Sequence, residues 1–253
     1  MTPRLDRRGF CLRTLAGLGT SLLGGCDDLS GRPWLRRLLG GAEEVNLWLQ
    51  RRVLPHQALA REYGEADLSP EFRANGSTDP DDADYRRLAS GGFADWRLQI
   101  GGLVERPQGF SLAELRAMPA RTQITRHDCV EGWSCIGKWT GVPLAVLLQR
   151  VGVRPAARFV LFRCADTLED SLYYESIGLD DAYHPQTILA YDMNGGALAV
   201  AHGAPLRLRV ERQLGYKMAK YVMAVELVDS FAGIGSGRGG YWEDRGYEWY
   251  AGI

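Results

Sequence analysis

Short segments of alternating apolar and polar residues, separated by turn residues, fill the chain between residues 96 and 229 and constrain its fold. Alternation with a period of two predicts strands that bury one face. We expect strands at 96–104, 122–130, 158–164, 187–192, 206–211 and 221–229. Asn194-Gly195 is predicted to form a hairpin turn.

Two short helices interrupt these strands. Ser111 is the expected N-cap of a helix over 111–115, and a second helix is predicted at 144–151, after Gly141-Val142-Pro143. Strands and helices do not alternate regularly, which disfavours a doubly wound sheet. The predicted class is α+β, rich in β, in a single compact domain.

The composition is that of an ordinary globular protein, with 45% hydrophobic and 24% charged residues among 253. The formal net charge of −1 argues against a general nucleic-acid binder, which needs an excess of cations for phosphate contacts. The lysines are Lys138, Lys217 and Lys220, so a lysine is an uncommon choice in this arginine-rich chain.

The first 26 residues are typical of a targeting segment. Arg7 and Arg8 precede Phe10 and a glycine-rich apolar stretch that is too short to span a bilayer. The arginine pair resembles a twin-arginine export signal, which carries folded, cofactor-loaded proteins. Leu23-Gly24-Gly25-Cys26 resembles a lipobox. We therefore expect a protein on the periplasmic side of the inner membrane, lipid-anchored at Cys26; the alternative is ordinary cleavage nearby.

The remaining sequence divides into three parts. Residues 27–63 are expected to form a tether and a helix at 43–54 that ends at Pro55. Residues 64–230 form the main domain, which begins with a turn-rich loop over 64–92. Residues 231–253 form a Gly-rich, aromatic tail that we expect to pack on the domain or to meet a partner. Because no helix follows its glycines, a dinucleotide site is not expected.

Cys129 stands where a predicted strand ends and a Gly-Trp turn begins. From the residues alone, four roles are open: a buried apolar residue, a nucleophile, a metal ligand, or half of a disulfide with Cys135. A structural zinc site is disfavoured, because the spacings of His and Cys do not match the paired zinc patterns.

The sequence from His127 to Leu148, which includes Cys129-Val130-Glu131-Gly132-Trp133-Ser134, resembles the sulfite oxidase superfamily of molybdenum enzymes. The similarity covers about residues 70–230 and is greatest to the periplasmic branch typified by the catalytic subunit of protein-methionine-sulfoxide reductase. It implies a β-rich, mixed-sheet molybdopterin-binding domain of the sulfite oxidase type. It also implies that Cys129 is the molybdenum ligand and the catalytic residue, which suits the preference of soft metals for thiolates.

A second pair of segments is similar to the molybdopterin-binding region of that superfamily: His202 to Arg207, and Gly215 to Lys220. Cations and backbone N–H groups in a turn suit the terminal phosphate of the pterin. The alternative is a solvated basic strand face. For Lys217, a structural role is the alternative to cofactor binding. The resemblance implies that the cofactor-binding residues are His202, Arg207, Met218, Ala219 and Lys220.

Looser matches add further candidates. Arg73 and Asn75 lie in the loop that reaches the pterin in the family, with a plain turn as the alternative. Cys164 occupies a position whose family counterpart lies beside the cofactor, with a buried strand cysteine as the alternative. His184 precedes Pro185 and is interpreted as structural.

The chain also departs from sulfite oxidases. Too little sequence follows residue 230 for their dimerisation or haem domains, so we expect a monomer without haem, and no cysteine pattern predicts an iron–sulfur cluster. Glu131, Gly132 and Trp133 stand where those enzymes place sulfite-binding arginines.

The resulting hypothesis is an exported, mononuclear molybdenum oxidoreductase with a mononucleotide-free molybdopterin. It is expected to transfer oxygen atoms, reducing an S-oxide or N-oxide with electrons from a membrane cytochrome b or a similar protein. The alternatives are a sulfite-type oxidase, a thiol enzyme with Cys129 as nucleophile, and a non-catalytic binding lipoprotein of the same fold.

Overall fold

The computed structural model describes residues 32–35, 41, 45, 48, 49, 52, 58–169 and 171–253. The chain splits into two units, residues 1–53 and 54–253, and the second unit contains the fold described below. The targeting segment, including Cys26, lies outside the described residues, as does most of the helix predicted at 43–54. Among the described helices, none is long and apolar enough to cross a membrane.

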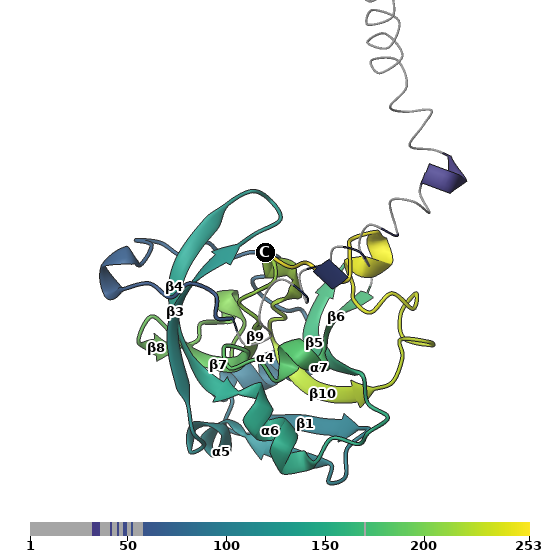
Figure 1. Ribbon diagram of the computed structural model, residues 1–253. Coiled ribbons are helices and arrows are strands. Elements are labelled where there is room, and N and C mark those ends of the chain that lie inside the picture. Colours follow the sequence, from purple (N-terminus) through teal and green to yellow (C-terminus); the bar gives the residue numbers. More distant parts are fainter. Residues whose placement is uncertain are drawn as a thin grey trace, which may run out of the picture. The chain divides into compact units, whose positions relative to one another are not determined.

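The first of two sheets in this unit has the strand order β2-β1-β10-β5-β6 (Figure 1). The strands β1 and β10 run parallel, and the other neighbours are antiparallel, so the sheet is mixed. Its strands are β1 (Arg97–Gly102), β2 (Gln108–Ser111), β5 (Phe159–Leu168), β6 (Ser171–Gly178) and β10 (Val222–Val228).

The second sheet is antiparallel and has the order β3-β4-β7-β8, with β9 paired to β7. Asn194 and Gly195 join β7 to β8 with φ values of 52° and 85°, as a two-residue turn requires, which confirms the predicted hairpin. The strands are β3 (Arg121–Asp128), β4 (Ser134–Pro143), β7 (Ile188–Met193), β8 (Gly196–Ala197) and β9 (Arg207–Arg209).

Short helices connect the strands. The side chain of Ser111 accepts a hydrogen bond from Glu114 N and forms the predicted N-cap of α5. In α6, residues at positions i, i+3, i+4 and i+7 are buried, so one apolar face packs on the core. The α-helices are α4 (Ala83–Ser90), α5 (Leu112–Arg116), α6 (Leu144–Val151) and α7 (Leu179–Ala182). The 3₁₀ turns are η1 (Glu65–Asp67), η2 (Val200–His202), η3 (Gly215–Lys217) and η4 (Glu243–Arg245).

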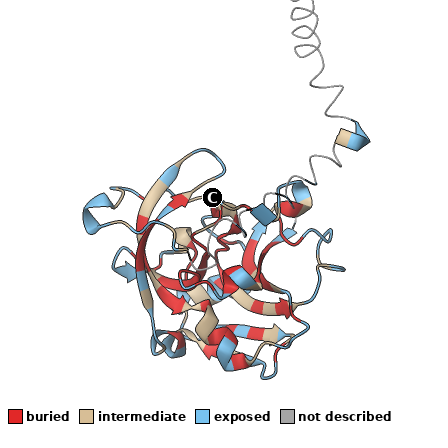
Figure 2. Cartoon of the chain, in the orientation of Figure 1, coloured by how far each residue is buried: buried red, intermediate tan, exposed pale blue. Residues whose placement is uncertain are grey.

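The core fills the space between the sheets and beneath α6, where most strand positions are buried (Figure 2). At Gly141, β4 and β7 approach each other so closely that a Cβ atom would lie 2.2 Å from the Leu189 carbonyl oxygen. A glycine is therefore required at this crossing, which holds the hairpin of β3 and β4 against the rest of the sheet.

The α+β, β-rich fold class is confirmed, and α6 begins and ends where the sequence predicts. The prediction of a loop throughout 64–92 is wrong, because α4 forms at 83–90 with Asp82 accepting from Tyr85 N at 2.7 Å. The strands β2, β4 and β6 are also absent from the prediction. In β6 both faces are covered, so six consecutive buried residues replace the expected alternation.

The C-terminal tail packs on the domain, one of the two outcomes expected for it. Tyr241 is buried, and its backbone N–H donates to Tyr174 O at 3.0 Å. Glu243 enters a buried ion-pair cluster in which Lys217 Nζ donates to Glu243 Oε1 and to Glu175 Oε1, the latter at 2.5 Å. All three side chains are at most 1% exposed. Lys217 therefore holds the tail against β6.

The buried cluster yields a stability prediction. Lys217→Met leaves two carboxylates facing each other in the interior, so we expect it to lower the free energy of unfolding by about 3–5 kcal/mol in denaturant titrations. Lys138→Met is the control, because Lys138 pairs with Glu65 at the surface and should cost at most about 1 kcal/mol. Equal losses for the two variants would contradict a role of Lys217 in holding the tail.

Candidate active site

Cys129 follows the last residue of β3 and begins a tight turn into β4. Its backbone N–H donates to Trp133 O at 2.9 Å, and Gly132 N donates back to Cys129 O at 3.0 Å. Gly132 has a φ of 87°, a conformation that favours glycine. The turn fixes the backbone on both sides of the thiol, so the thiol has a defined direction.

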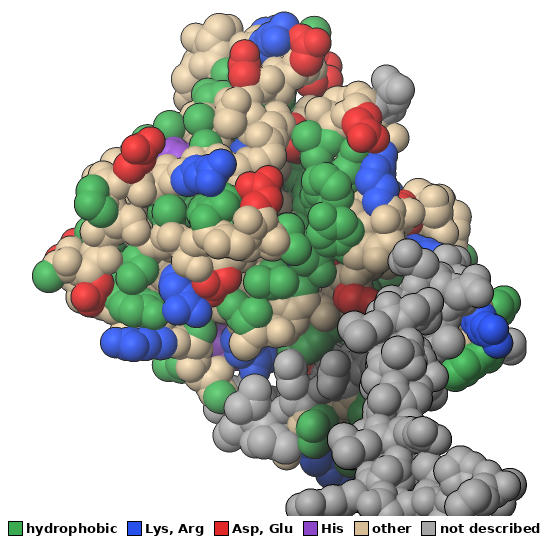
Figure 3. All heavy atoms as spheres, turned by 90° about the horizontal axis from the view of Figure 1, so that it is seen from above, with side chains coloured by type: hydrophobic (Ala, Val, Ile, Leu, Met, Phe, Trp, Pro, Cys, Tyr) green, Lys and Arg blue, Asp and Glu red, His purple; other side chains and the backbone are tan. Residues whose placement is uncertain are grey.

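Cys129 lines a cavity of the structure. The cavity lies between the turn after β3, the loop at 75–77, the end of β5, the segment at 215–220 and the C-terminal tail. Its wall is formed by Asn75, Gly76, Ser77, Cys129, Val130, Glu131, Asp166, Leu168, Tyr173, Gly215, Tyr216, Met218, Lys220, Trp242 and Tyr247. Figure 3 views the molecule of Figure 1 from above and shows a band of hydrophobic side chains flanked by charged ones.

The surroundings of Cys129 are partly apolar. Burial raises the pKa of its thiol, an effect reduced by hydrogen bonding to the Glu131 backbone and by the positive charge of Arg73. Arg73 lies 5.4 Å from the ring centroid of Trp133, whose Nε1 donates to Glu131 at 2.9 Å. A bound metal cation lowers the pKa of a thiol ligand, so it would hold Cys129 as the thiolate despite the effect of burial.

Lys220 organises the opposite wall. Its Nζ donates to the carbonyl oxygens of Asn75 at 2.7 Å, Ala201 at 3.2 Å and Ser77. These bonds use all three N–H groups of the ammonium. Burial and then the charge of Arg207 lower the pKa of Lys220 to about 7. Lys220 thus fixes the loop at 75–77 beside the segment at 215–220 and contributes charge to the cavity wall.

Arg207 is a buried cation with incomplete hydrogen bonding. Its Nη1 donates to His202 O at 3.0 Å, but Nε and Nη2 have no hydrogen-bond partner within the described part of the chain. Burial and then the charge of Arg209 lower the pKa of Arg207 to about 9. Such a group is expected where an acceptor-rich anion binds.

A similar shortage of partners occurs at His202. Among the residues that the structure describes, none forms a hydrogen bond with its buried Nδ1. Its ring lies 5.9 Å from that of Phe72, and burial followed by the charge of Arg207 lowers its pKa. Arg207 and His202 therefore present polar atoms in one buried region.

The other predicted residues differ in whether they reach the cavity. Arg73 is exposed beside the turn. Cys164 is buried in β5, and burial raises its pKa well above the ordinary value. Met218 lines the cavity, whereas Ala219 is buried and its carbonyl oxygen accepts from Leu208 N at 2.8 Å. Of the predicted residues, Asn75, Cys129, Met218 and Lys220 line one cavity.

The structure also bears on the disulfide and zinc alternatives for Cys129 and on the structural role predicted for His184. Cys129 and Cys135 are free thiols, so the disulfide alternative is wrong. Within the ranges that the structure describes, no group of three or more metal-binding side chains occurs, which disfavours zinc. His184 hydrogen-bonds with both ring nitrogens, at 3.1 Å to Ala58 O and at 3.3 Å to Gln186 N, as a structural histidine does.

Several cavity residues are absent from the sequence prediction. Asp166 is 3% exposed and lines the cavity, and its Oδ1 has no partner in the described segments. It lies two positions beyond Cys164, so the strand period of two could have indicated a shared face. Trp242 and Tyr247 come from the tail, whose aromatic residues are visible in the sequence but carry no positional signal.

The chain is similar to known molybdopterin-dependent proteins. A family model described as oxidoreductase molybdopterin binding domain matches residues 88–232. YedZ1 of Azospira oryzae, named as a candidate subunit of protein-methionine-sulfoxide reductase, is 38% identical over 249 residues, covering 97% of this chain and 87% of that protein. MsrP of Ralstonia nicotianae, a protein-methionine-sulfoxide reductase catalytic subunit, is 31% identical over 211 residues, covering 78% of this chain and 63% of its own.

A solved structure is also similar. The sulfane dehydrogenase SoxCD from Paracoccus pantotrophus matches with a TM-score of 0.51 and 25% identity, covering 69% of this chain and 46% of that chain. This chain thus spans less than two thirds of the MsrP relative and of the solved chain. The protein belongs to the molybdopterin-binding oxidoreductase family, within the predicted sulfite oxidase superfamily.

The residues of the site fit this family's cofactor. Arg207 and His202 offer polar atoms that lack partners in the described part of the protein, Lys220 adds positive charge, and Cys129 offers a soft ligand at the cavity. A molybdopterin combines an anionic, acceptor-rich end with a soft metal end, so the two kinds of group are both required.

Asp166 yields a prediction of pH dependence in the cofactor-free protein. Burial, opposed by Lys220, raises its pKa from 3.8 to about 6. The folded state therefore binds a proton more tightly than the unfolded state, so stability falls as the pH rises from 4 to 6. Asp166→Asn removes this loss, and we expect its stability relative to wild type to rise across that window by on the order of 3 kcal/mol.

Thermal or denaturant unfolding at several pH values measures this difference. Asp84→Asn, on an exposed part of α4, is the reference variant. If the difference in unfolding free energy between Asp166→Asn and wild type stays constant from pH 4 to pH 7, burial does not raise the pKa of Asp166.

Proposed function

We propose that this protein reduces S-oxides, with protein-bound methionine sulfoxide as the first candidate, by oxygen-atom transfer at a molybdenum held by Cys129. The observation that carries the proposal is Cys129 at a cavity that is also lined by aromatic side chains and by Asp166, whose Oδ1 has no partner among the described residues. The names of the YedZ1 and MsrP relatives support the choice of substrate.

The proposed reaction breaks the S=O bond of the sulfoxide. Two electrons and two protons are consumed, and a thioether and one water molecule are formed. When bound, the cofactor would supply a metal that accepts the oxygen atom and passes two electrons from the partner protein to the substrate. The protein would supply the thiolate, the electrostatic setting and the position of the substrate.

In this proposal the predicted residues hold different parts of the cofactor. Cys129 binds the metal. Arg207 and His202 donate to its anionic end, and Lys220 contributes charge while fixing the loop at Asn75. The remaining proposed contacts are Arg73, Cys164, Met218 and Ala219.

The substrate is proposed to enter along the aromatic wall. Trp242 lies 5.2 Å from Tyr247, which lies 5.3 Å from Tyr216, between ring centroids, and all three line the cavity. Thioether sulfur, the form of the side chain after reduction, packs favourably at aromatic rings.

The location and partner are part of the same proposal. The arginine pair and Cys26 support export by the twin-arginine route and a lipid anchor on the periplasmic side of the inner membrane. We propose that a membrane cytochrome b or a similar protein donates the electrons, and that residues 27–63 act as a tether ahead of the domain at 64–230.

The experiment that tests the function compares Cys129→Ala with Cys135→Ala. Both variants remove a free cysteine from the same hairpin, but Cys135 lies outside the cavity wall. Wild type and Cys135→Ala, exported from a molybdenum-replete host, should contain about one molybdenum per chain and reduce methionine sulfoxide with a reduced dye. Cys129→Ala should lose turnover at least about 100-fold, because its metal ligand is removed.

Two results would count against the proposal. Absence of molybdenum from exported wild-type protein would favour the binding-lipoprotein alternative. Oxidation of sulfite by the molybdenum-loaded enzyme, without reduction of S-oxides or N-oxides, would favour the sulfite-type oxidase.

The aromatic wall yields a separate kinetic prediction. Trp242→Ala removes a contact worth about 1 kcal/mol, so we expect the KM for methionine sulfoxide to rise about fivefold with little change in kcat. Trp242→Phe keeps an aromatic surface and should stay within about twofold of wild type. Steady-state kinetics over a range of substrate concentrations measures both. An unchanged KM for Trp242→Ala would show that Trp242 does not contribute to substrate binding.

A further inference from the structure

His127 is a fully buried histidine on the strand that leads to Cys129. His127 is the penultimate residue of β3 and lies two positions before Cys129, at the start of the turn. The His127 ring lies between Phe72 and Trp133, with centroid distances of 5.7 Å and 5.5 Å. This packing fixes the position of the ring below the metal-binding turn.

The hydrogen bond at Nδ1 determines where the ring carries its proton. Arg209 Nη1 lies 3.1 Å from His127 Nδ1, and Met218 Sδ lies 3.3 Å from the same atom. An arginine guanidinium has only donors, so Nδ1 must accept. A neutral imidazole that accepts at Nδ1 carries its hydrogen on Nε2. The geometry therefore makes Nε2 a donor.

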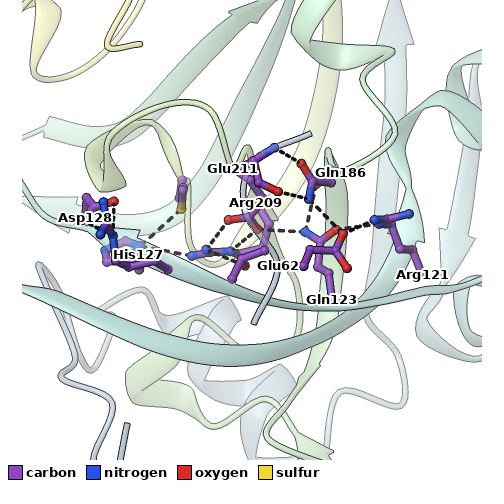
Figure 4. A network of polar contacts seen from close by, with 12 residues as sticks. Glu62, Arg121, Gln123, His127, Asp128, Gln186, Arg209 and Glu211 are labelled. Atoms are coloured by element: carbon purple, nitrogen blue, oxygen red, sulfur yellow. Dashed lines mark hydrogen bonds and ion pairs between the residues drawn. The ribbon is translucent and has the colours of Figure 1, made fainter. Parts of the chain in front are cut away.

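Arg209 is itself fixed in place, as Figure 4 shows. Its Nε and Nη2 donate to the two carboxylate oxygens of Glu211 at 2.9 Å and 2.7 Å, and its guanidinium lies 4.4 Å from the Trp139 ring. Gln123 donates to Glu211 at 2.8 Å. The network consists of buried groups, so the direction of the Arg209 donor is held from several sides.

The donor at Nε2 is not used by the described residues of the protein: the atom is buried there without a hydrogen-bond partner. It lies against Gly215, where a Cβ atom would be 2.4 Å from Nε2. His127 itself is not part of the cavity wall, but Gly215, beside Nε2, and Met218, beside Nδ1, both line the cavity. By contrast, His184 satisfies both ring nitrogens with backbone groups.

We propose that His127 is a further cofactor-binding residue, whose Nε2–H donates a hydrogen bond to an acceptor atom of the molybdopterin, and that Arg209 is the positioning residue that directs this donor. The inference rests on the proposed function for the identity of the cofactor. It also explains why residue 215 is a glycine: a side chain there would occupy the space beside Nε2.

The first test measures cofactor content per folded chain. Molybdenum is determined by elemental analysis and pterin by the fluorescence of its oxidised form, released from protein exported from a molybdenum-replete host. His127→Phe retains a ring between Phe72 and Trp133 but has no donor, and we expect its cofactor content to fall at least fivefold. His127→Gln retains an N–H group and should recover part of that loss. His184→Gln is the matched control and should equal wild type.

The decisive measurement of the second test is made on wild-type protein. In wild-type holoprotein labelled with ¹⁵N histidine, the His127 ring should show a protonated Nε2 and an unprotonated Nδ1, with His127→Gln used to assign the signal. The double variant Arg209→Met/Glu211→Gln removes both charges together, and we expect both tautomers to be populated in it.

The outcomes separate the two proposals. Wild-type cofactor content in folded His127→Phe, or a protonated Nδ1 in wild type, would overturn the role of His127 while leaving the proposed function in place. Wild-type protein without molybdenum or pterin would overturn the proposed function and this inference together.

Discussion

Two arginine side chains contact the ring of Trp139, and the arrangement of the site depends on their burial. The guanidinium groups of Arg207 and Arg209 lie 4.9 Å and 4.4 Å from the ring centroid. Glu211 neutralises Arg209, but Arg207 has no carboxylate partner in the described structure. An isolated buried cation is costly, so the fold is complementary to an anion before one is bound.

This constraint links the strands to the chemistry. The strand β9 delivers both arginines, and its pairing with β7 places them beside the β3–β4 hairpin, whose turn presents Cys129. The proposed metal ligand and the two arginines therefore come from one sheet and its connecting turn. The other sheet contributes the end of β5, with Asp166, to the same cavity. A change in the register of β9 would move the cations and leave the thiol in place.

The position of Cys129 at the end of a strand could be predicted from the local sequence, whereas its role and those of the other candidate residues were implied by the family resemblance. The helices capped by Ser111 and preceded by Pro143 were also predictable from the local sequence. Asp166 and the tail residues were not, because their approach to the cavity depends on long-range packing. The role of Lys220 in tying down the loop at Asn75 likewise depends on contacts across 145 positions of sequence.

The C-terminal tail has a consequence for how such proteins diversify. Trp242 and Tyr247 belong to a segment outside both sheets, which is attached through the buried cluster around Lys217 and through hydrogen bonds such as that from Tyr241 N to Tyr174 O. The proposed metal ligand and Arg207 belong to the β3–β4 hairpin and to β9. In our proposal, the surface that meets the substrate and the scaffold that holds the cofactor are thus encoded in separable stretches of one chain. Mutation can remodel the entrance of the site while the inherited redox core, with its tightly packed strands, stays unaltered.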